Sequence, residues 1–404
     1  MNVESIRNDF PILERKVNGK PLVYLDSGAT AQKPERVIEA VNRMHREQNA
    51  NIHRGVHQLS AEATQLYEQA RERVRSFIGA ASREEVIFTA GATASINTVA
   101  YAWSEQFLRE GDNIIISEME HHSNIVPWQL VAERKGAEIR VLPFDEDGRL
   151  KVELLDELLD NRTRMVAVTQ ASNTLGTRPD LRPIIEKAHR VGAHVMVDGC
   201  QGVVHGGVDV DALDCDFYAF SGHKLYAPTG IGVLYGKAEL LEAMPPFLAG
   251  GDMVDKVSFA KTTFAPLPLK FEAGTANFVG AVSLAEAIAY LEMLPAAEVA
   301  AHERHLLDYA TEQLSTIEGL KIYGTTANKA PIVSFNVAGC DHYDIGMILD
   351  KMGIAIRTGH HCAQPVMERY GVNGMCRASF GLYNNTADID ALVRGVERAV
   401  RMLR

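Results

Sequence analysis

The sequence has few cysteines, and their spacing excludes two kinds of site. The chain of 404 residues contains five of them: Cys200, Cys215, Cys340, Cys362 and Cys376. Their number is odd, they are scattered and no two form a C-x-x-C pair, so we expect neither a disulfide framework nor a zinc site built mainly from thiolates. We therefore expect free thiols in a reducing cytoplasm, most of them acting as small buried side chains.

Long apolar runs and a basic charge balance are also missing. No stretch approaches the roughly 20 apolar residues of a membrane helix, and no basic segment with an apolar core opens the chain as in a signal peptide. The formal net charge is -11, whereas nucleic-acid backbones require basic protein surfaces. The sequence predicts a protein whose partners include neither a membrane nor a nucleic acid.

The remaining composition is that of a folded protein, with 46% hydrophobic and 23% charged residues. Short segments rich in Val and Ile alternate with helical ones between residues 86 and 235, which predicts an α/β fold with a mostly parallel sheet. The pattern changes near residue 285. We expect a large domain over residues 23–285, a small domain over 286–404, and residues 1–22 packed on the small domain. A helix is predicted from Ala61 to Ile78, with Ser60 as its N-cap and Gly79 as its stop.

Polar side chains follow five of the predicted strands. Because the carboxyl ends of parallel strands meet at one edge of a sheet, these residues should lie close together. They are Thr93 after strand 86–89, His121 and His122 after 113–117, Asn173 after 164–169, Asp198 and Gln201 at the end of 194–198, and Ser221, His223 and Lys224 after 217–221.

Each residue of this set has a plainer interpretation on its own: Asp198 as a helix N-cap and Lys224 as a solvated lysine. Together, these residues indicate a site for one ligand. A helix opening at Thr93 suits a phosphate, a carboxylate suits a protonated ring nitrogen, and a lysine can form an imine. Phosphate, pyridinium and aldehyde in one molecule describe pyridoxal phosphate.

Several segments carry a family resemblance. Ser221-Gly222-His223-Lys224 and Asp198-Gly199-Cys200-Gln201 resemble the cofactor-binding segments of the aminotransferase class V family. Residues 357–363 (RTGHHCA) resemble the cysteine loop of the group II, SufS-like cysteine desulfurases. Residues 120–124 (EHHSN), 51–55 (NIHRG) and 271–275 (FEAGT) are similar to the same branch, and the similarity covers nearly the whole chain.

The resemblance implies a fold-type-I homodimer with a mostly parallel seven-stranded sheet and a small α/β C-terminal domain. It implies pyridoxal 5'-phosphate held by Lys224 as an imine, with His121 stacked on the ring. The implied roles of the other residues are as follows: Asp198 at the pyridine nitrogen, Gln201 at the phenolic oxygen, Thr93, Ser221 and His223 at the phosphate, Thr275 from the other subunit, and Arg377, Asn173 and Arg357 at the substrate.

The implied reaction removes sulfur from L-cysteine, which leaves L-alanine and a persulfide on Cys362. Lys224 and His121 would be the other catalytic residues, and positive neighbours would lower the pKa of the thiol. A SufE-like or SufU-like acceptor protein would take the sulfur toward iron–sulfur cluster assembly. Four residues separate Arg357 from Cys362, and such a short loop implies a constrained cysteine that needs a docked acceptor.

The sequence departs from the family pattern at two positions, and two alternative functions remain open. Cys200 stands where the family often has alanine, and Ala92 where it often has a hydroxyl residue beside Thr93. Selenocysteine lyase activity remains the alternative within the family. Outside it, a zinc-binding scaffold could use His360-His361-Cys362 or His53 with His57. Because adjacent residues rarely face one metal ion, we expect no metal site.

Overall fold

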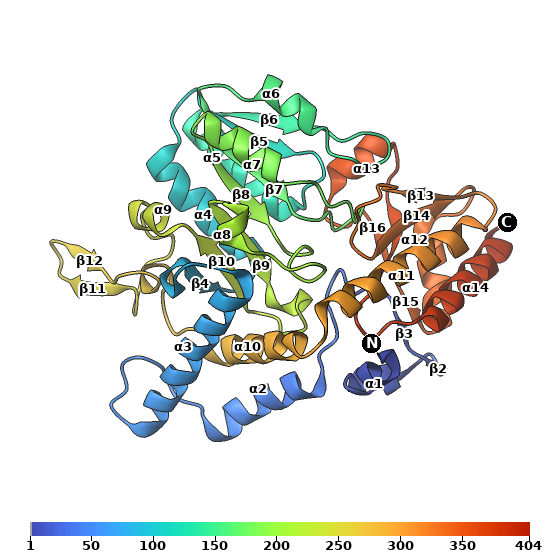
Figure 1. Ribbon diagram of the computed structural model, residues 1–404, viewed down its shortest axis with the longest axis horizontal. Coiled ribbons are helices and arrows are strands. Elements are labelled where there is room, and N and C mark those ends of the chain that lie inside the picture. The colour runs from blue at the N-terminus through green and yellow to red at the C-terminus, as the bar shows by residue number, and fades with distance from the viewer. Residues whose placement is uncertain (1) are drawn as a thin grey trace.

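A seven-stranded sheet lies at the centre of the larger part of the molecule, as the computed structural model describes it for residues 2–404 (Figure 1). The strand order is β4-β10-β9-β8-β7-β5-β6. The strands are β4 (Val86–Thr89), β5 (Asn113–Ser117), β6 (Glu138–Leu142), β7 (Thr163–Thr169), β8 (His194–Asp198), β9 (Phe217–Ser221) and β10 (Gly232–Gly236).

The register of this sheet confirms the predicted fold class. Strands β6, β5, β7, β8 and β9 pair in parallel, and β10 runs antiparallel to both β9 and β4. The three inner strands β5, β7 and β8 are rich in Val, Ile and Met because nearly all of their residues are buried.

Alternate side chains of the strands enter two separate apolar cores. Ile114, Met165 and Met196 pack with α4 (Ala92–Phe107) and α5 (Val126–Lys135). On the opposite face, Val166 and Val195 belong to the core that includes α3 (Gln58–Ile78), α7 (Arg182–Arg190) and α10 (Phe278–Glu292). Burial of each such side chain contributes about 1.5–3 kcal/mol, so the helices hold the strand ends in fixed positions.

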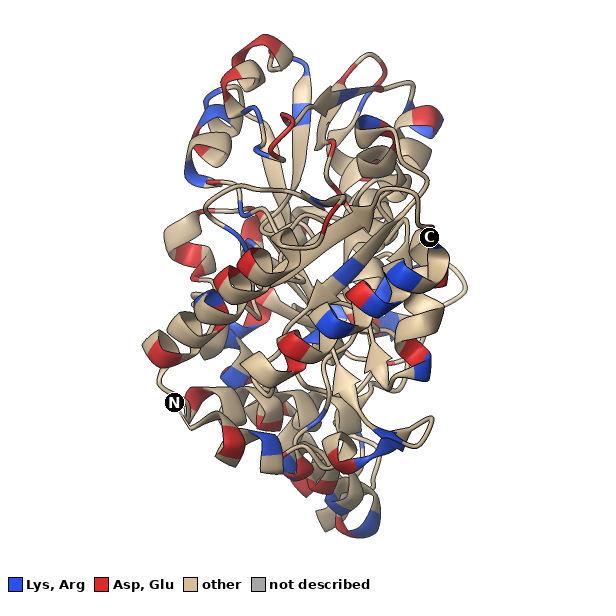
Figure 2. Cartoon of the chain, turned by 90° about the vertical axis from the view of Figure 1, so that its right-hand side faces the viewer, with Lys and Arg blue, Asp and Glu red and all other residues tan. Residues whose placement is uncertain are grey.

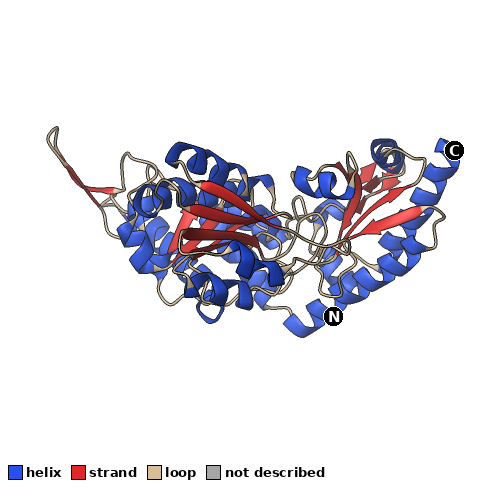
Figure 3. Ribbon diagram, turned by 90° about the horizontal axis from the view of Figure 1, so that it is seen from above, coloured by secondary structure: helices blue, strands red, loops and turns tan. Residues whose placement is uncertain are grey.

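The smaller part contains a second sheet, seen at the right of Figures 1 and 3. Its antiparallel order is β13-β14-β17-β16, from β13 (Leu320–Tyr323), β14 (Ile332–Val337), β17 (Met375–Ser379) and β16 (Arg357–Gly359). Helices α11 (Ala296–Ser315), α12 (His342–Lys351) and α14 (Thr386–Leu403) share one apolar core with it. This second core is built around Phe335 and Leu392, both fully buried.

Residue 285, where we expected the domain boundary, falls inside α10, and that helix packs as a unit in the core of the large part. At the other end, β3 (Val23–Tyr24) pairs in parallel with β15 (Ile354–Ala355) of the small part. Helix α1 (Val3–Asn8) joins the same part, because Arg7 Nη1 lies 2.8 Å from Asp388 Oδ2.

Helix α3 begins three residues before the predicted start, and its cap is His57. The Nδ1 atom of His57 accepts the N–H of Ser60 at 3.2 Å, so a ring nitrogen takes the place of the expected serine oxygen. Gly79 ends the helix with φ +71°, as predicted. Ile354–Ala355 and Arg357–Gly359 follow each other closely but form β15 and β16 in two different sheets.

A hairpin of β11 (Val254–Val257) and β12 (Thr262–Phe264) was not predicted and projects from the large part (Figures 1 and 3). The other elements are α2 (Glu35–Glu47), α6 (Leu155–Leu158), α8 (Val210–Leu213), α9 (Ala238–Ala243), α13 (Gln364–Tyr370) and the short pair β1 (Lys16–Val17) and β2 (Lys20–Pro21).

Acidic and basic residues lie mostly on helices and connecting segments (Figure 2). Over residues 2–404, no single helix is long and apolar enough to cross a membrane. The pair α10 and α11 passes that test only when joined, and it is bent by 86°.

Candidate active site

A cavity of about 200 Å³ lies between the carboxyl ends of the large sheet and the loop that carries Cys362. Its lining joins residues from both parts of the chain. They are Gly28, Ala29, Ala92, Thr93, His121, Ser123, Asn173, Asp198, Cys200, Ser221, His223, Lys224, Arg357, His361, Cys362 and Arg377. Ten of the residues predicted from the sequence are in this set, so the strand ends converge as expected.

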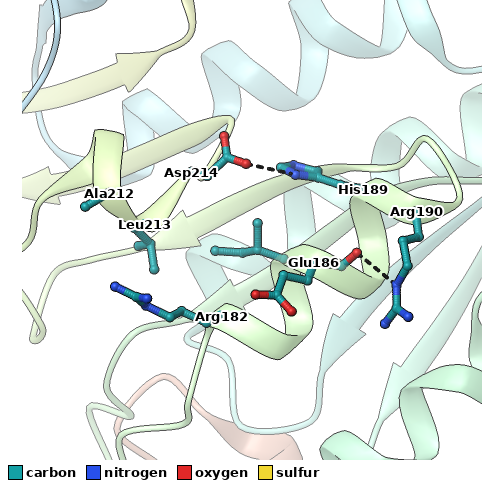
Figure 4. Close-up of a pocket in the computed structure, with 8 residues that line it drawn as sticks. Arg182, Glu186, His189, Arg190, Ala212, Leu213 and Asp214 are labelled. Carbon is teal, nitrogen blue, oxygen red and sulfur yellow. Dashed lines mark hydrogen bonds and ion pairs between the residues drawn. The ribbon is translucent and has the colours of Figure 1, made fainter.

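A larger depression of about 650 Å³ lies between α7 and α8 (Figure 4). Its histidine is held by carboxylates, because His189 Nε2 lies 2.8 Å from Asp216 and Nδ1 lies 3.4 Å from Asp214. No lysine or cysteine lines it. The chemistry expected from the sequence is therefore concentrated in the smaller cavity.

Asp198 and Lys224 enter the cavity from the ends of neighbouring strands. Asp198 is the last residue of β8 and is buried, and its Oδ1 accepts the N–H of Cys200 at 2.9 Å. Lys224 ends the turn after β9. Within residues 2–404, its Nζ takes part in neither a hydrogen bond nor an ion pair, which leaves the amine free to react. Burial and Asp198 raise the pKa of Cys200 to about 12, so that thiol stays protonated beside them.

Two histidines near Lys224 are kept neutral. Burial and the charge of Lys224 lower the pKa of His121 to about 4. Burial, Lys224 and Lys33 lower the pKa of His223 to about 4 as well. At neutral pH, each ring is therefore uncharged and can accept a proton or stack on an apolar surface.

The start of α4 offers a place for an anion. Gly91 precedes the helix with φ +148°, a conformation that favours glycine. Ser221 Oγ accepts the N–H of Ala92 at 2.8 Å, and Thr93 Oγ1 lies 2.7 Å from Ser123 Oγ. A 16-residue helix directs its free N–H groups and positive dipole end at this corner. Ser123 was not predicted, because nothing in the sequence places it opposite Thr93.

These residues fit pyridoxal phosphate. The free Nζ of Lys224 suits its aldehyde, the buried carboxylate of Asp198 suits its ring nitrogen, and the start of α4 with Ser221 and Thr93 suits its phosphate. The main-chain N–H of Ala92 donates to Ser221 Oγ, and Ala92 lacks the hydroxyl group that the family often has.

Two of the predicted cofactor residues lie outside the cavity. Gln201 is buried, and its Nε2 donates to Gly28 O at 2.8 Å. It supports a residue that lines the cavity. Thr275 is exposed and does not line the cavity of its own chain. Its predicted role was to act from the other subunit.

Arg377 carries a buried positive charge at the rim of the cavity. Its Nη1 donates to Asn173 O at 2.9 Å, and its Nη2 lies 3.0 Å from Asp26 Oδ1. Its Nε is buried and has no hydrogen-bond partner within residues 2–404. Arg377 lines the cavity, and a guanidinium group there is suited to a substrate carboxylate.

Asn173 and Arg357, the other predicted substrate residues, are both engaged with the protein. Asn173 Nδ2 donates to His361 O at 2.8 Å, so its side chain anchors the cysteine loop. Arg357 lies 3.2 Å from Asp26 Oδ2 and remains half exposed. Asp26 was missed by sequence reasoning, because it comes from the N-terminal segment and follows no strand of the large sheet.

The cysteine loop has an unusual backbone. His361 and Cys362 have φ values of +53° and +55°, in the left-handed region that non-glycine residues rarely adopt. The N–H of His122 donates to Cys362 O at 2.7 Å, and the N–H of Cys362 donates to His360 Nδ1 at 3.1 Å. Such strain costs about 1–3 kcal/mol per residue and is typical of functional sites.

The expected positive neighbours do not all face the thiol. His361 is buried, and its Nε2 lies 3.0 Å from Met375 O. Burial and Arg377 lower the pKa of His361 to about 2, so the ring is neutral. The charge of Arg357 is directed at Asp26. The imidazole groups nearest the thiol belong to His360 and to His122, whose pKa is lowered by burial and by His360.

A buried carboxyl group connects two of the strands whose ends form the site. Glu120 is fully buried and accepts the N–H of Thr169 at 2.7 Å and Asn124 Nδ2 at 2.7 Å, and it also hydrogen-bonds to Ser117. Burial raises its pKa to about 8 despite these hydrogen bonds. The neutral acid ties β5 to β7 directly before His121.

Comparison with known proteins extends over the whole chain. The profile of the aminotransferase class-V family matches residues 23–392. A cysteine desulfurase of Enterobacter sp. (strain 638) is 51% identical over 99% of both chains. The solved structure of the cysteine desulfurase CsdA from Escherichia coli has a TM-score of 0.93 at 43% identity, with both chains fully covered. An apo cysteine desulfurase from Thermococcus onnurineus NA1 has a TM-score of 0.93 at 37% identity, covering 99% of this chain and 98% of that one.

Proposed function

The chain belongs to the aminotransferase class-V family, and we propose that its reaction takes place in the cavity that Lys224, Asp198 and Cys362 line together. The enzyme is a pyridoxal-phosphate-dependent cysteine desulfurase of group II. The observation that carries the assignment of the site is the presence of an unpaired lysine and a cysteine in one cavity, since the reaction needs both an imine-forming amine and a sulfur acceptor.

The residues that would hold the cofactor are those already described at the strand ends. Lys224 would bind its aldehyde, Asp198 its ring nitrogen, and Thr93, Ser221 and His223 its phosphate, with His121 covering the ring. When bound, the cofactor supplies an electron sink that stabilises negative charge at the α-carbon of an amino acid.

Arg377 would orient the substrate by its carboxylate. Arg377 lines the cavity, and Asp26 and Asn173 O hold its two terminal nitrogens. A guanidinium fixed on two sides loses little freedom when a carboxylate binds. This places the thiol side of L-cysteine toward the loop that carries Cys362.

Lys224 and His121 would manage protons. Lys224 Nζ would take the proton from the α-carbon of the substrate and return it later in the reaction. His121 is neutral, because burial and Lys224 lower its pKa, so it can accept or donate a proton without first changing charge.

Cys362 would receive the sulfur. Its thiolate attacks the sulfur of the substrate, so that an S–S bond forms as the Cβ–S bond breaks. The electron pair of the broken bond stays with the substrate carbon, which is protonated and leaves as L-alanine. The enzyme keeps the sulfur as a persulfide on Cys362.

A protein acceptor would then take the sulfur. The loop is tied to the large part through His122 and Asn173, so Cys362 has little freedom to carry its sulfur elsewhere. We infer that an acceptor of the SufE-like or SufU-like kind comes to the loop, and that the sulfur serves iron–sulfur cluster assembly. All five cysteines are free thiols, which suits work in the cytoplasm.

We also infer a homodimer. Val56, Phe259 and Val257 are 106%, 115% and 67% exposed, an unusual state for large apolar side chains. They lie in the loop before α3 and in the β11–β12 hairpin, and Arg54 and Asp252 join these two regions by an ion pair of 2.9 Å. Thr275 is exposed as well, as a residue that acts on a partner's site would be.

The alternative substrate is L-selenocysteine. Selenium leaves carbon more easily than sulfur does, so its release would depend less on attack by Cys362. Assay of both substrates with the wild type and with Cys362→Ala separates the two activities. A desulfurase loses alanine formation from L-cysteine in the variant. Equal loss with L-selenocysteine would argue against an independent lyase activity.

A further inference from the structure

Two histidines from different parts of the chain meet at the thiol of Cys362. His122 follows β5 of the large part, whereas His360 precedes the cysteine in the small part. One ligand atom from each of His122, His360 and Cys362 lies within 4.8 Å of the other two. His122 is half-buried, and the other two side chains lie toward the surface of the cavity mouth.

The lone pairs of both rings are directed at the cysteine turn. His122 Nε2 accepts the N–H of Gln364 at 3.2 Å, and His360 Nδ1 accepts the N–H of Cys362 at 3.1 Å. A nitrogen that accepts a hydrogen bond carries no proton. Each ring therefore presents an unprotonated nitrogen to the segment 362–364, which is the form that a metal ion requires.

The backbone holds the three groups together from both sides. The main-chain bond from His122 N to Cys362 O joins the two parts at this point, and the left-handed φ of Cys362 fixes the exit direction of its side chain. Neighbouring His361 is directed away, to Met375 O. The two adjacent histidines of the loop therefore have different surroundings: His360 lies near the thiol, and His361 lies at Met375 O. The second imidazole group near the thiol is that of His122, from the large part.

We propose that His122, His360 and Cys362 form a binding site for a soft transition-metal ion, with Zn²⁺ as the representative. Two imidazole nitrogens and a thiolate suit such an ion, and a mixed N/S set disfavours Mg²⁺ and Ca²⁺. Zinc bonds of about 2.0–2.3 Å place ligand atoms roughly 3.5 Å apart. The three ligand atoms lie within 4.8 Å of one another, so metal binding requires them to move closer and breaks the two hydrogen bonds to the turn.

Occupation of this site would exclude sulfur uptake. Binding replaces the thiol proton of Cys362, which goes to solvent, by a Zn–S bond, and the same sulfur is then unable to attack the substrate. Three protein ligands leave a fourth position open. The bound ion would reversibly block the thiol of Cys362. The proposal differs from the expectation of no metal site, which considered only neighbours in sequence and did not include His122.

The test is calorimetric titration of the cofactor-loaded enzyme with ZnCl₂ under reductant-free nitrogen. We expect one site per chain, and at least a tenfold loss of affinity in each of His122→Ala, His360→Ala and Cys362→Ser. The control variants are Cys340→Ser, which removes another partly exposed thiol, and His305→Ala, which removes an exposed histidine. MgCl₂ is the control ion and should not bind.

A second readout is the rate at which iodoacetamide alkylates Cys362, located by peptide mass analysis. Stoichiometric Zn²⁺ should slow this alkylation at least tenfold in the wild type and much less in His360→Ala, a variant that keeps the thiol. Titrations that leave all three ligand variants at wild-type affinity, or alkylation that is indifferent to Zn²⁺, would overturn the proposal. Both readouts are independent of turnover, so they hold whether or not the sulfur reaction is as proposed.

Discussion

Asp26 Oδ1 lies 3.0 Å from Nη2 of the buried Arg377. The same carboxylate reaches Arg357 at 3.2 Å, so one acidic residue of the N-terminal segment positions two arginines at the cavity rim. Arg377 is only 1% exposed, and a buried charge persists only when it is paired. The ion pair with Asp26 therefore explains how the guanidinium group stays charged and keeps its orientation.

Replacing Asp26 should weaken substrate binding more than the chemical steps. In Asp26→Asn, Arg377 loses a charged hydrogen-bond partner, an interaction worth about 1.5–3 kcal/mol. We expect KM for L-cysteine to rise roughly 10- to 100-fold, by the relation of 1.4 kcal/mol per factor of ten, and kcat to change much less. Steady-state kinetics measure this. Asp145→Asn, which breaks an exposed pair with Arg149, is the matched control. An unchanged KM would show that Arg377 keeps its place without Asp26.

Lys224→Ala should abolish the visible absorbance of the cofactor imine and reduce alanine formation by at least a thousandfold. The reason is that no other amine among the cavity-lining residues is available. Absorbance of the purified variant after incubation with pyridoxal phosphate gives the result directly. Lys135→Ala, a surface lysine paired with Glu105, serves as the control. Wild-type absorbance in Lys224→Ala would mean that another lysine forms the imine.

Glu272 should prove structural, although it lies in a segment with family resemblance. Its carboxylate receives Arg71 at 2.6 and 2.9 Å, Tyr67 Oη at 2.7 Å and the N–H of Phe88 at 2.7 Å. Removing one partner of a buried ion pair costs about 3–5 kcal/mol. Calorimetric melting of Glu272→Gln should show a clearly lowered Tm, with the cofactor spectrum intact below it. Glu292→Gln removes an exposed pair with Arg73 and should melt like the wild type.

Glu120 makes the stability of the fold dependent on pH. Burial raises its pKa from 4.5 to about 8, so the folded state holds a proton that the unfolded state releases between these values. Its contribution is complete below pH 4.5 and is lost as the pH rises through about 8. The size of this contribution is on the order of a few kcal/mol.

In Glu120→Gln, residue 120 no longer titrates, so its contribution to the pH dependence of stability is lost. We expect its Tm to fall less than that of the wild type between pH 5.5 and pH 8.5, two values chosen roughly to bracket the transition. Glu133→Gln, at an exposed position of α5, should keep the wild-type slope. Parallel melting curves of Glu120→Gln and the wild type across this range would show that Glu120 is ionised in the fold.

Much of the fold follows from local patterns in the sequence. The strands at 86–89, 113–117, 194–198 and 217–221 have the predicted bounds because nearly every residue of each is buried. The β11–β12 hairpin was missed for the opposite reason: its residues are mostly exposed, so packing imposes no pattern on them.

The candidate site could be predicted only where strand ends define it. Lys224 and Asp198 meet because β8 and β9 are parallel neighbours. Asp26 and the pairing of His122 with Cys362 depend on how the small part sits on the large one, which no local pattern encodes. The roles of Asn173 and Gln201 also depend on tertiary contacts, since their amide nitrogens bind His361 O and Gly28 O.

The central claim is that Cys362 keeps the sulfur until an acceptor arrives. The direct measurement is the amount of alanine formed per active site when cofactor-loaded enzyme receives L-cysteine without reductant or acceptor. The account predicts about one alanine per site followed by a stall, and almost none from Cys362→Ala with an unchanged cofactor spectrum. Continued turnover in the wild type, or an equal burst from Cys362→Ala, would contradict it.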